Sequence, residues 1–131
     1  MQEFSVRTRA RVELIDITGE VKAAIRKENV RSGICLVFCP HTTAGITVQE
    51  NADPDVTADL VKELNKIVPF DDDYHHAEGN SAAHIKSSLV GCSKSFILDE
   101  GKLLLGTWQA VYFCEFDGPR NRQVMVKCCG S

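Results

Sequence analysis

Several features that would mark a special environment are missing from this chain. No apolar run approaches the length needed to cross a membrane, and the first residues, M-Q-E-F-S-V-R-T-R, lack the apolar stretch of a secretory signal peptide. The net charge is only −3 and the basic residues are scattered, so the clustered basic face of a nucleic-acid-binding protein is absent. We therefore expect a cytoplasmic protein with neither a membrane nor a nucleic acid as partner.

Two catalytic or metal-binding signatures are also missing. The six cysteines form no C-x-x-C pair, which gives a thiolate zinc site little support, and in the cytosol we expect them to be reduced thiols. Cys35, Cys39 and Cys114 stand in apolar stretches and are predicted to be buried, and the surroundings of Cys35 and Cys39 should keep those two thiols inert. Without a G-x-S-x-G elbow, Ser-His-Asp catalysis is not supported either.

The sequence does contain enough apolar material for one core. Its 131 residues are 44% hydrophobic and show no linker or repeat, so we predict a single domain over residues 1–131. Periodicity and turn residues predict three helices: one that Thr18 caps and that ends before Asn29, one that Asp53 and Pro54 open and Pro69 stops, and one over 82–90. Strands are predicted over 4–16 (one strand or a bent pair), 33–39, 46–50, 94–98, 103–106, 107–116 and 123–128.

This order of elements defines the expected fold class. The continuous apolar run from Gly33 to Cys39 is typical of a strand buried on both faces. Helices and strands are partly segregated, and hairpins dominate the last third of the chain. The pattern favours a single-domain α+β fold with mixed or antiparallel sheets and two to three helices.

Histidine is concentrated in one segment, Y-H-H-A-E-G-N-S-A-A-H-I-K from Tyr74 to Lys86, which holds three of the four histidines. The fourth, His41, begins a second polar island, H-T-T-A-G. A solvated loop that happens to be rich in histidine is one interpretation. Two separate islands favour the other, because functional sites are usually assembled from distant segments.

These histidines suggest a metal site. His41, His76 and His84 offer three imidazole nitrogens with an open fourth position, as in catalytic zinc sites. His84 falls in the first turn of a predicted helix, where the helix dipole disfavours imidazolium and a neutral, metal-binding ring is favoured. The alternative for His84 is a satisfied histidine on a helix face.

Phosphate binding is a second hypothesis for the same segment. Gly79-Asn80-Ser81 precedes a helix start, where free N–H groups attract anions, and Lys86 adds a positive charge. Because His84 and Lys86 are two residues apart, an ideal helix points them to different sides. Further polar groups, Thr42, Asn51 and Gln109, stand at predicted strand ends, whereas the lone Trp108 is more typical of a core.

Four motifs in order along the chain resemble the YjbQ-like family, which carries the name secondary thiamine-phosphate synthase. They are H-T-T-A-G-I-T-V-Q-E-N-A-D-P-D-V from His41, Y-x-H from Tyr74, E-G-N-S-A-A-H-I-K from Glu78 and L-G-T-W-Q-A-V-Y-F-C-E-F-D-G-P-R from Leu105. The resemblance implies a sandwich-like α+β subunit in a homotrimer. It implies a polar site formed by His41, Thr42, Asn51, His76, Asn80, His84, Lys86 and Gln109. His75 fills the variable position of Y-x-H and is a rival ligand to His76.

The same resemblance implies a function. Condensation of a pyrimidine pyrophosphate with a thiazole phosphate would give thiamine phosphate and pyrophosphate, a transferase reaction that suits a cationic, metal-bearing pocket. In this hypothesis His41, His84 and Lys86 are catalytic; Thr42, Asn51, Asn80 and Gln109 bind ligand; and His41, His76 and His84 hold a divalent metal, zinc by preference. A metal-dependent phosphate-ester hydrolase and a non-catalytic module that binds a metal or an anionic metabolite remain as alternatives.

Overall fold

A computed structural model describes all residues, 1–131. In chain order its elements are β1 (Gln2–Arg7), β2 (Glu13–Asp16), α1 (Thr18–Glu28), β3 (Gly33–Phe38), β4 (Ala44–Glu50), α2 (Pro54–Ile67), α3 (Ser81–Val90), β5 (Ser93–Asp99), β6 (Lys102–Leu103), β7 (Gln109–Glu115) and β8 (Asn121–Gly130). No helix among them is long and apolar enough to span a bilayer.

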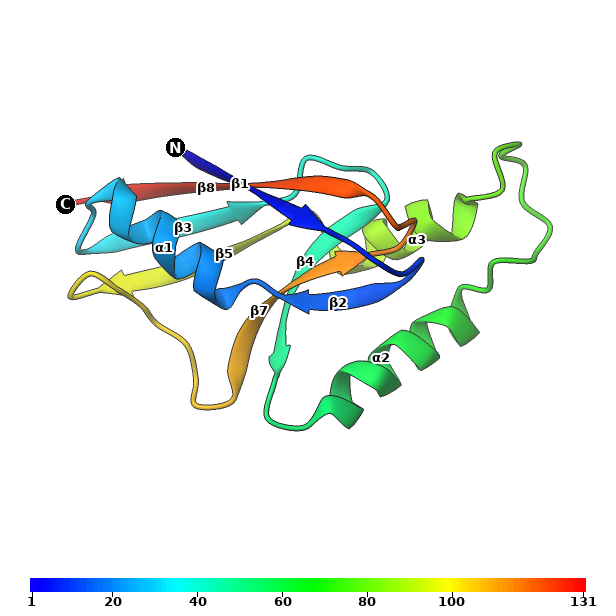
Figure 1. The fold of residues 1–131 in the computed structure, drawn as a ribbon, viewed down its shortest axis with the longest axis horizontal. Helices are drawn as coiled ribbons and strands as arrows, with labels where there is room; N and C mark the ends of the chain where they lie inside the picture. Colours follow the sequence, from blue (N-terminus) through cyan, green and yellow to red (C-terminus); the bar gives the residue numbers. More distant parts are fainter.

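The strands form two sheets whose pairings are all antiparallel. One sheet has the order β1-β8-β3-β5-β6 and the other β2-β7-β4. The structure thus confirms the α+β class with three helices in one domain. The predicted 4–16 strand is a pair, β1 and β2, whose members belong to different sheets. Figure 1 shows α1 lying along the larger sheet, while α2 and α3 stand at the opposite end of the molecule.

The main core lies between the larger sheet, α1 and the inner face of the smaller sheet, and it takes one face of each strand. In β3, Cys35 and Val37 are fully buried, but Ile34 and Leu36 are 48% and 38% exposed. The prediction that 33–39 is buried on both faces is therefore wrong. An antiparallel sheet needs a cover on only one face, and here the second face has none.

Helix termini confirm one capping prediction and correct another. Asp53 caps α2 by accepting a hydrogen bond from the Asp55 N–H at 2.9 Å, with Pro54 in the first helical position. Thr18 does not cap α1, whose N-cap is Ile17. The Thr18 hydroxyl instead donates to the Asp16 carboxylate and accepts from the Val111 N–H, so it joins the helix start to β2 and β7.

The segment before β7 differs from its prediction. The strand expected over 103–106 is only the two-residue β6, because pairing with β5 stops at Leu98 and Leu103. Residues 104–108 form a loop with Leu104 and Trp108 57% and 62% exposed. The interpretation of Trp108 as a core residue is therefore wrong.

Candidate functional site

His76 and His84 lie side by side, with ring centroids 5.3 Å apart in an edge-on arrangement. The turn at Gly79, whose φ is +79°, returns the chain so that α3 starts at Ser81 and places His84 in its first turn, as predicted. The two rings line an open hollow of about 350 Å³ together with Asp73, Tyr74, His75, Ser81 and Ile85.

The spacing of the two rings fits a shared metal ion. A zinc–nitrogen bond is about 2.0–2.1 Å, so two imidazoles on one tetrahedral ion have their centroids roughly 5 Å apart. His75 and Asp73 line the same hollow. Even so, no three His, Cys, Asp or Glu side chains of the subunit are gathered closely enough to hold an ion in the present conformation.

His41 lies apart from that pair, on the loop between β3 and β4. Its Nε2 accepts a hydrogen bond from the Gln123 N–H at 2.9 Å. A backbone N–H can only donate, so Nε2 of His41 carries no proton. The ring is therefore neutral, with its proton on Nδ1. Burial and then the Arg122 guanidinium hold the pKa of His41 below its ordinary value. His41 is therefore neutral as a metal ligand must be, but its free nitrogen is occupied by β8.

Lys86 is completely buried and does not face the histidine hollow. Its ammonium donates to the Asn65 Oδ1 at 2.7 Å and lies 3.7 Å from the centre of the Phe70 ring. Burial, and after it the charge of Arg11, lowers the pKa of Lys86 to about 8. The helix thus turns His84 and Lys86 to different sides, as their spacing predicts.

Asn80 sits at the start of α3 and joins it to the β7–β8 turn. Its Nδ2 donates to the Asp117 carboxylate at 2.9 Å, whereas its Oδ1 is buried without a partner. Its carbonyl oxygen already accepts from Ala83 and His84, so the N–H groups of Ser81 and Ala82 are the unbonded donors of this helix end.

The remaining predicted residues are spread over both ends of β4. Thr42 is exposed beside His41 at the start of the strand. Asn51 and Gln109 lie at its other end, about 20 Å away at the usual rise per residue. There the Asn51 Nδ2 donates to Asp16 at 3.3 Å, and the Gln109 Oε1 accepts from the Gly106 N–H at 2.8 Å. The fold of a single chain does not bring these residues to the histidine hollow.

A buried ionic network near His41 was missed by the sequence reasoning. The Arg122 guanidinium pairs with the Glu115 carboxylate, and Arg122 also donates to the carbonyl and hydroxyl oxygens of Thr43 at 3.2 and 2.9 Å. Thr8 adds a further hydrogen bond to Glu115 at 2.7 Å. A signal was present, because Arg122 precedes Val124 and Val126 in alternation and so belongs to the inward face of β8.

The surroundings of Lys86 were missed too, and no periodicity indicated them. Phe70 follows α2, Asn65 lies within it and Arg11 comes from the β1–β2 loop; they meet only in the folded chain. By contrast, the thiols behave as predicted. Burial raises the pKa of Cys35 and Cys114 to about 12 and raises that of Cys39, which keeps them protonated and inert.

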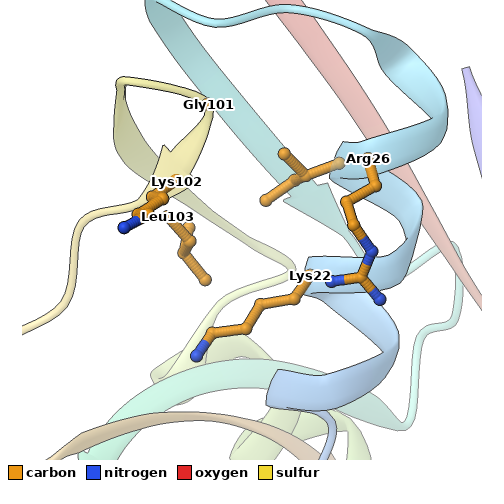
Figure 2. Close-up of a pocket in the computed structure, with 6 residues that line it drawn as sticks. Lys22, Arg26, Gly101, Lys102 and Leu103 are labelled. Atoms are coloured by element: carbon orange, nitrogen blue, oxygen red, sulfur yellow. The ribbon is translucent and has the colours of Figure 1, made fainter.

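A second hollow, also about 350 Å³, lies between α1 and the β5–β6 hairpin and is shown in Figure 2. Lys22, Arg26 and Lys102 line it, but their charged ends point in different directions. It contains no imidazole, carboxylate or thiol and none of the predicted site residues. It is therefore separate from the candidate site.

The fold and these contacts define a small α+β protein with an imidazole-lined surface hollow at a helix start. The chain belongs to the UPF0047 protein YjbQ-like family, whose sequence model matches residues 2–131.

Relatives and solved structures agree with this assignment. The UPF0047 protein YugU of Bacillus subtilis is 49% identical over 131 residues, covering 99% of each chain. A UPF0047 protein of Methanocaldococcus jannaschii is 51% identical over 128 residues, covering 98% of this chain and 93% of its own. The crystal structure of an uncharacterized YjbQ/UPF0047 protein of Clostridium acetobutylicum superposes with a TM-score of 0.96 at 55% identity, covering 98% of this chain and all of its own. None of these names states a reaction.

Proposed function

We propose that the protein is a metal-dependent enzyme acting on a small phosphorylated metabolite, with a thiamine-phosphate synthase-type transfer as the reaction suggested by family resemblance. The observation that carries the proposal is the His76–His84 pair, whose ring spacing suits one tetrahedral ion in an open hollow. A divalent metal bound there, zinc by preference, would supply charge stabilisation for a pyrophosphate leaving group.

The chain's own residues would position the substrate and move protons. His84 stands at the helix start, where the unbonded N–H groups of Ser81 and Ala82 favour an anion. Asn80 offers its unpartnered Oδ1 to a ligand donor. His41 is neutral and keeps a proton on Nδ1 that it can donate.

A homotrimer belongs to the same proposal. Ile34 and Ile97 are cross-strand neighbours on the uncovered face of the larger sheet, both about half exposed, and Leu36 continues that face. Folded monomers rarely leave such contiguous apolar patches in water. Association of subunits would cover the patch and would bring residues of a neighbouring chain close to the histidine hollow.

Metal content tests the ligand assignment. We expect one divalent ion per chain in untagged protein analysed by elemental mass spectrometry, and its loss in His76→Ala and His84→Ala. His75→Ala is the matched control and should keep the ion. An ion that stays at full occupancy in a His41→Ala/His84→Ala double variant would refute the three-histidine assignment, and loss only in His75→Ala would move the site to that residue.

Turnover separates the enzyme from a binding module. A panel of phosphomonoesters and pyrophosphates, including the two thiamine precursors, should yield turnover that His84→Ala abolishes without unfolding the protein. Hydrolysis of one phosphomonoester alone would favour the hydrolase. Tight binding without any turnover would replace the enzyme by the non-catalytic module.

Light scattering tests the assembly. We expect three times the 14.5 kDa chain mass, and dissociation when Ile34→Lys and Ile97→Lys are combined. A monodisperse wild-type peak at the monomer mass would refute the trimer.

A further inference from the structure

The ammonium of Lys86 has fewer partners than a buried charge requires. An ammonium carries three N–H donors, and only Asn65 accepts from this one. No carboxylate lies within ion-pair distance of its nitrogen, although the side chain is fully buried. Buried charges are normally paired. The surroundings of Lys86 therefore lack an anion.

A second cation stands on the other side of the Phe70 ring. The Arg11 guanidinium carbon lies 3.6 Å from the ring centre, and the Lys86 nitrogen lies 3.7 Å from it. Two groups that close to the centre of one face would collide, so the ring separates them. The Arg11 guanidinium carbon and the Lys86 nitrogen are therefore at most about 7 Å apart, the sum of the two distances to the ring centre. Neither group forms an ion pair.

That separation is the one a phosphate group requires. A phosphate that accepts charge-assisted hydrogen bonds of about 2.8 Å from two opposed cations holds their centres roughly 7 Å apart. The space between Lys86 and Arg11 thus has the charge and the width of a phosphate site, and an apolar ring occupies it.

Phe70 is held there by few other contacts. The ring belongs to neither of the two hydrophobic clusters and is only half-buried. It lies three positions after Ile67, the last residue of α2, a helix with no buried residue of its own, although the C-cap Val68 is buried. Elements with so few buried contacts open at low cost, and the ring can move without leaving either hydrophobic cluster.

We propose that Phe70 is a displaceable cover, and that the phosphate of a phosphorylated small molecule takes its place between Lys86 and Arg11. Asn65 keeps its hydrogen bond to Lys86 in both states and holds the ammonium in position. This inference goes beyond the proposed function, because it adds a phosphate site on a different side of α3 from His84, separate from the histidine hollow.

Phosphate affinity tests the site without any assay of turnover. Inorganic phosphate and pyrophosphate are titrated calorimetrically at constant ionic strength into wild type and variants whose fold is checked by circular dichroism. Lys86→Met should weaken binding at least tenfold and Arg11→Gln about fivefold. Arg9→Gln is the matched control, an exposed arginine two positions before Arg11 with no contact to the ring, and should bind like wild type.

The cover itself is tested by Phe70→Ala, and by Phe70→Leu should the alanine variant unfold. Both remove the ring, so phosphate should bind several-fold more tightly than to wild type. Lys86 should also become reactive toward an acylating reagent, with phosphate protecting it, as mapped by mass spectrometry. Unchanged or weaker phosphate affinity in folded Phe70 variants would overturn the displacement.

The two-cation site would be overturned if Lys86→Met bound phosphate like wild type, or if Arg11→Gln had no more effect than Arg9→Gln. Failure of the proposed function gives a different result: phosphate would bind as described here while no substrate turned over.

Discussion

Arg122 and Lys86 are both buried cations, and their surroundings differ in one respect. Arg122 faces the Glu115 carboxylate and two oxygens of Thr43, so its charge is compensated. Lys86 has one amide oxygen and an aromatic face. Arg122 lies where the two sheets meet, whereas Lys86 lies beneath a helix without a buried residue.

This difference indicates that the charge of Arg122 is structural and that the charge of Lys86 serves ligand binding. The pair of Arg122 and Glu115 is complete within the chain, and removing either member leaves the other uncompensated. Burial and then the Arg11 charge lower the pKa of Lys86, which means that its site disfavours the charged form. A buried ammonium with too few partners, next to a side chain such as Phe70 that can move, is typical of a site where a ligand supplies the missing anion.

Breaking the complete pair should have the largest effect. Glu115→Gln leaves the Arg122 charge buried without its counter-charge, and we expect a loss of roughly 3–5 kcal/mol in the free energy of unfolding, measured by urea titration at pH 7. The exposed pair of Arg120 and Asp117 is the control, because Arg120→Ala should cost at most about 1 kcal/mol. Equal costs for the two variants would refute the structural role of Glu115.

The pH dependence of unfolding should distinguish Lys86 next. Its pKa is about 8 in the folded chain against an ordinary 10.5. Between these values the unfolded state holds the proton and the folded state does not, so the contribution of Lys86 to stability rises with pH. Relative to Lys86→Met, wild type should gain up to roughly 3 kcal/mol from pH 7 to pH 10.5. A constant difference across this window would contradict the lowered pKa.

At neutral pH the same substitution should stabilise the protein. Lys86→Met replaces an incompletely paired charge by an apolar chain of similar length, and the lost contact with Phe70 offsets part of the benefit. We expect a gain of about 1–2 kcal/mol in urea unfolding at pH 7. A loss comparable to that of Glu115→Gln would show that Lys86 is structural and would remove the contrast with Arg122.

The smallest effect is expected at Asn80. Asn80→Ala removes a hydrogen bond to Asp117 and, with it, a buried oxygen that has no partner. The two contributions oppose each other, so stability should change by less than about 1 kcal/mol. Thermal unfolding measures this change. A loss of several kcal/mol would place Asn80 with Glu115 among the structural residues.

Much of the fold was predictable because its signals are local. The Asp53-Pro54 start of α2, the His84 position in α3 and the alternation of β8 all follow from neighbouring residues. The β3 prediction failed because a continuous apolar run looks the same whether one face or both faces of the strand are covered. The prediction for Trp108 failed for a related reason: whether a loop residue is exposed depends on which distant segments pack against the loop.

For the candidate site, the sequence determined which chemical groups are present and tertiary structure decided which of them meet. The histidine-rich segment is visible in the sequence itself. The different directions of His84 and Lys86 follow from their spacing along one helix. The spacing of His76 and His84, the engagement of His41 by β8 and the place of Phe70 between Arg11 and Lys86 do not. The turn at Gly79 brings His76 and His84 together. The other contacts join segments far apart in the chain, and only the packing of sheets and helices sets the distances between them.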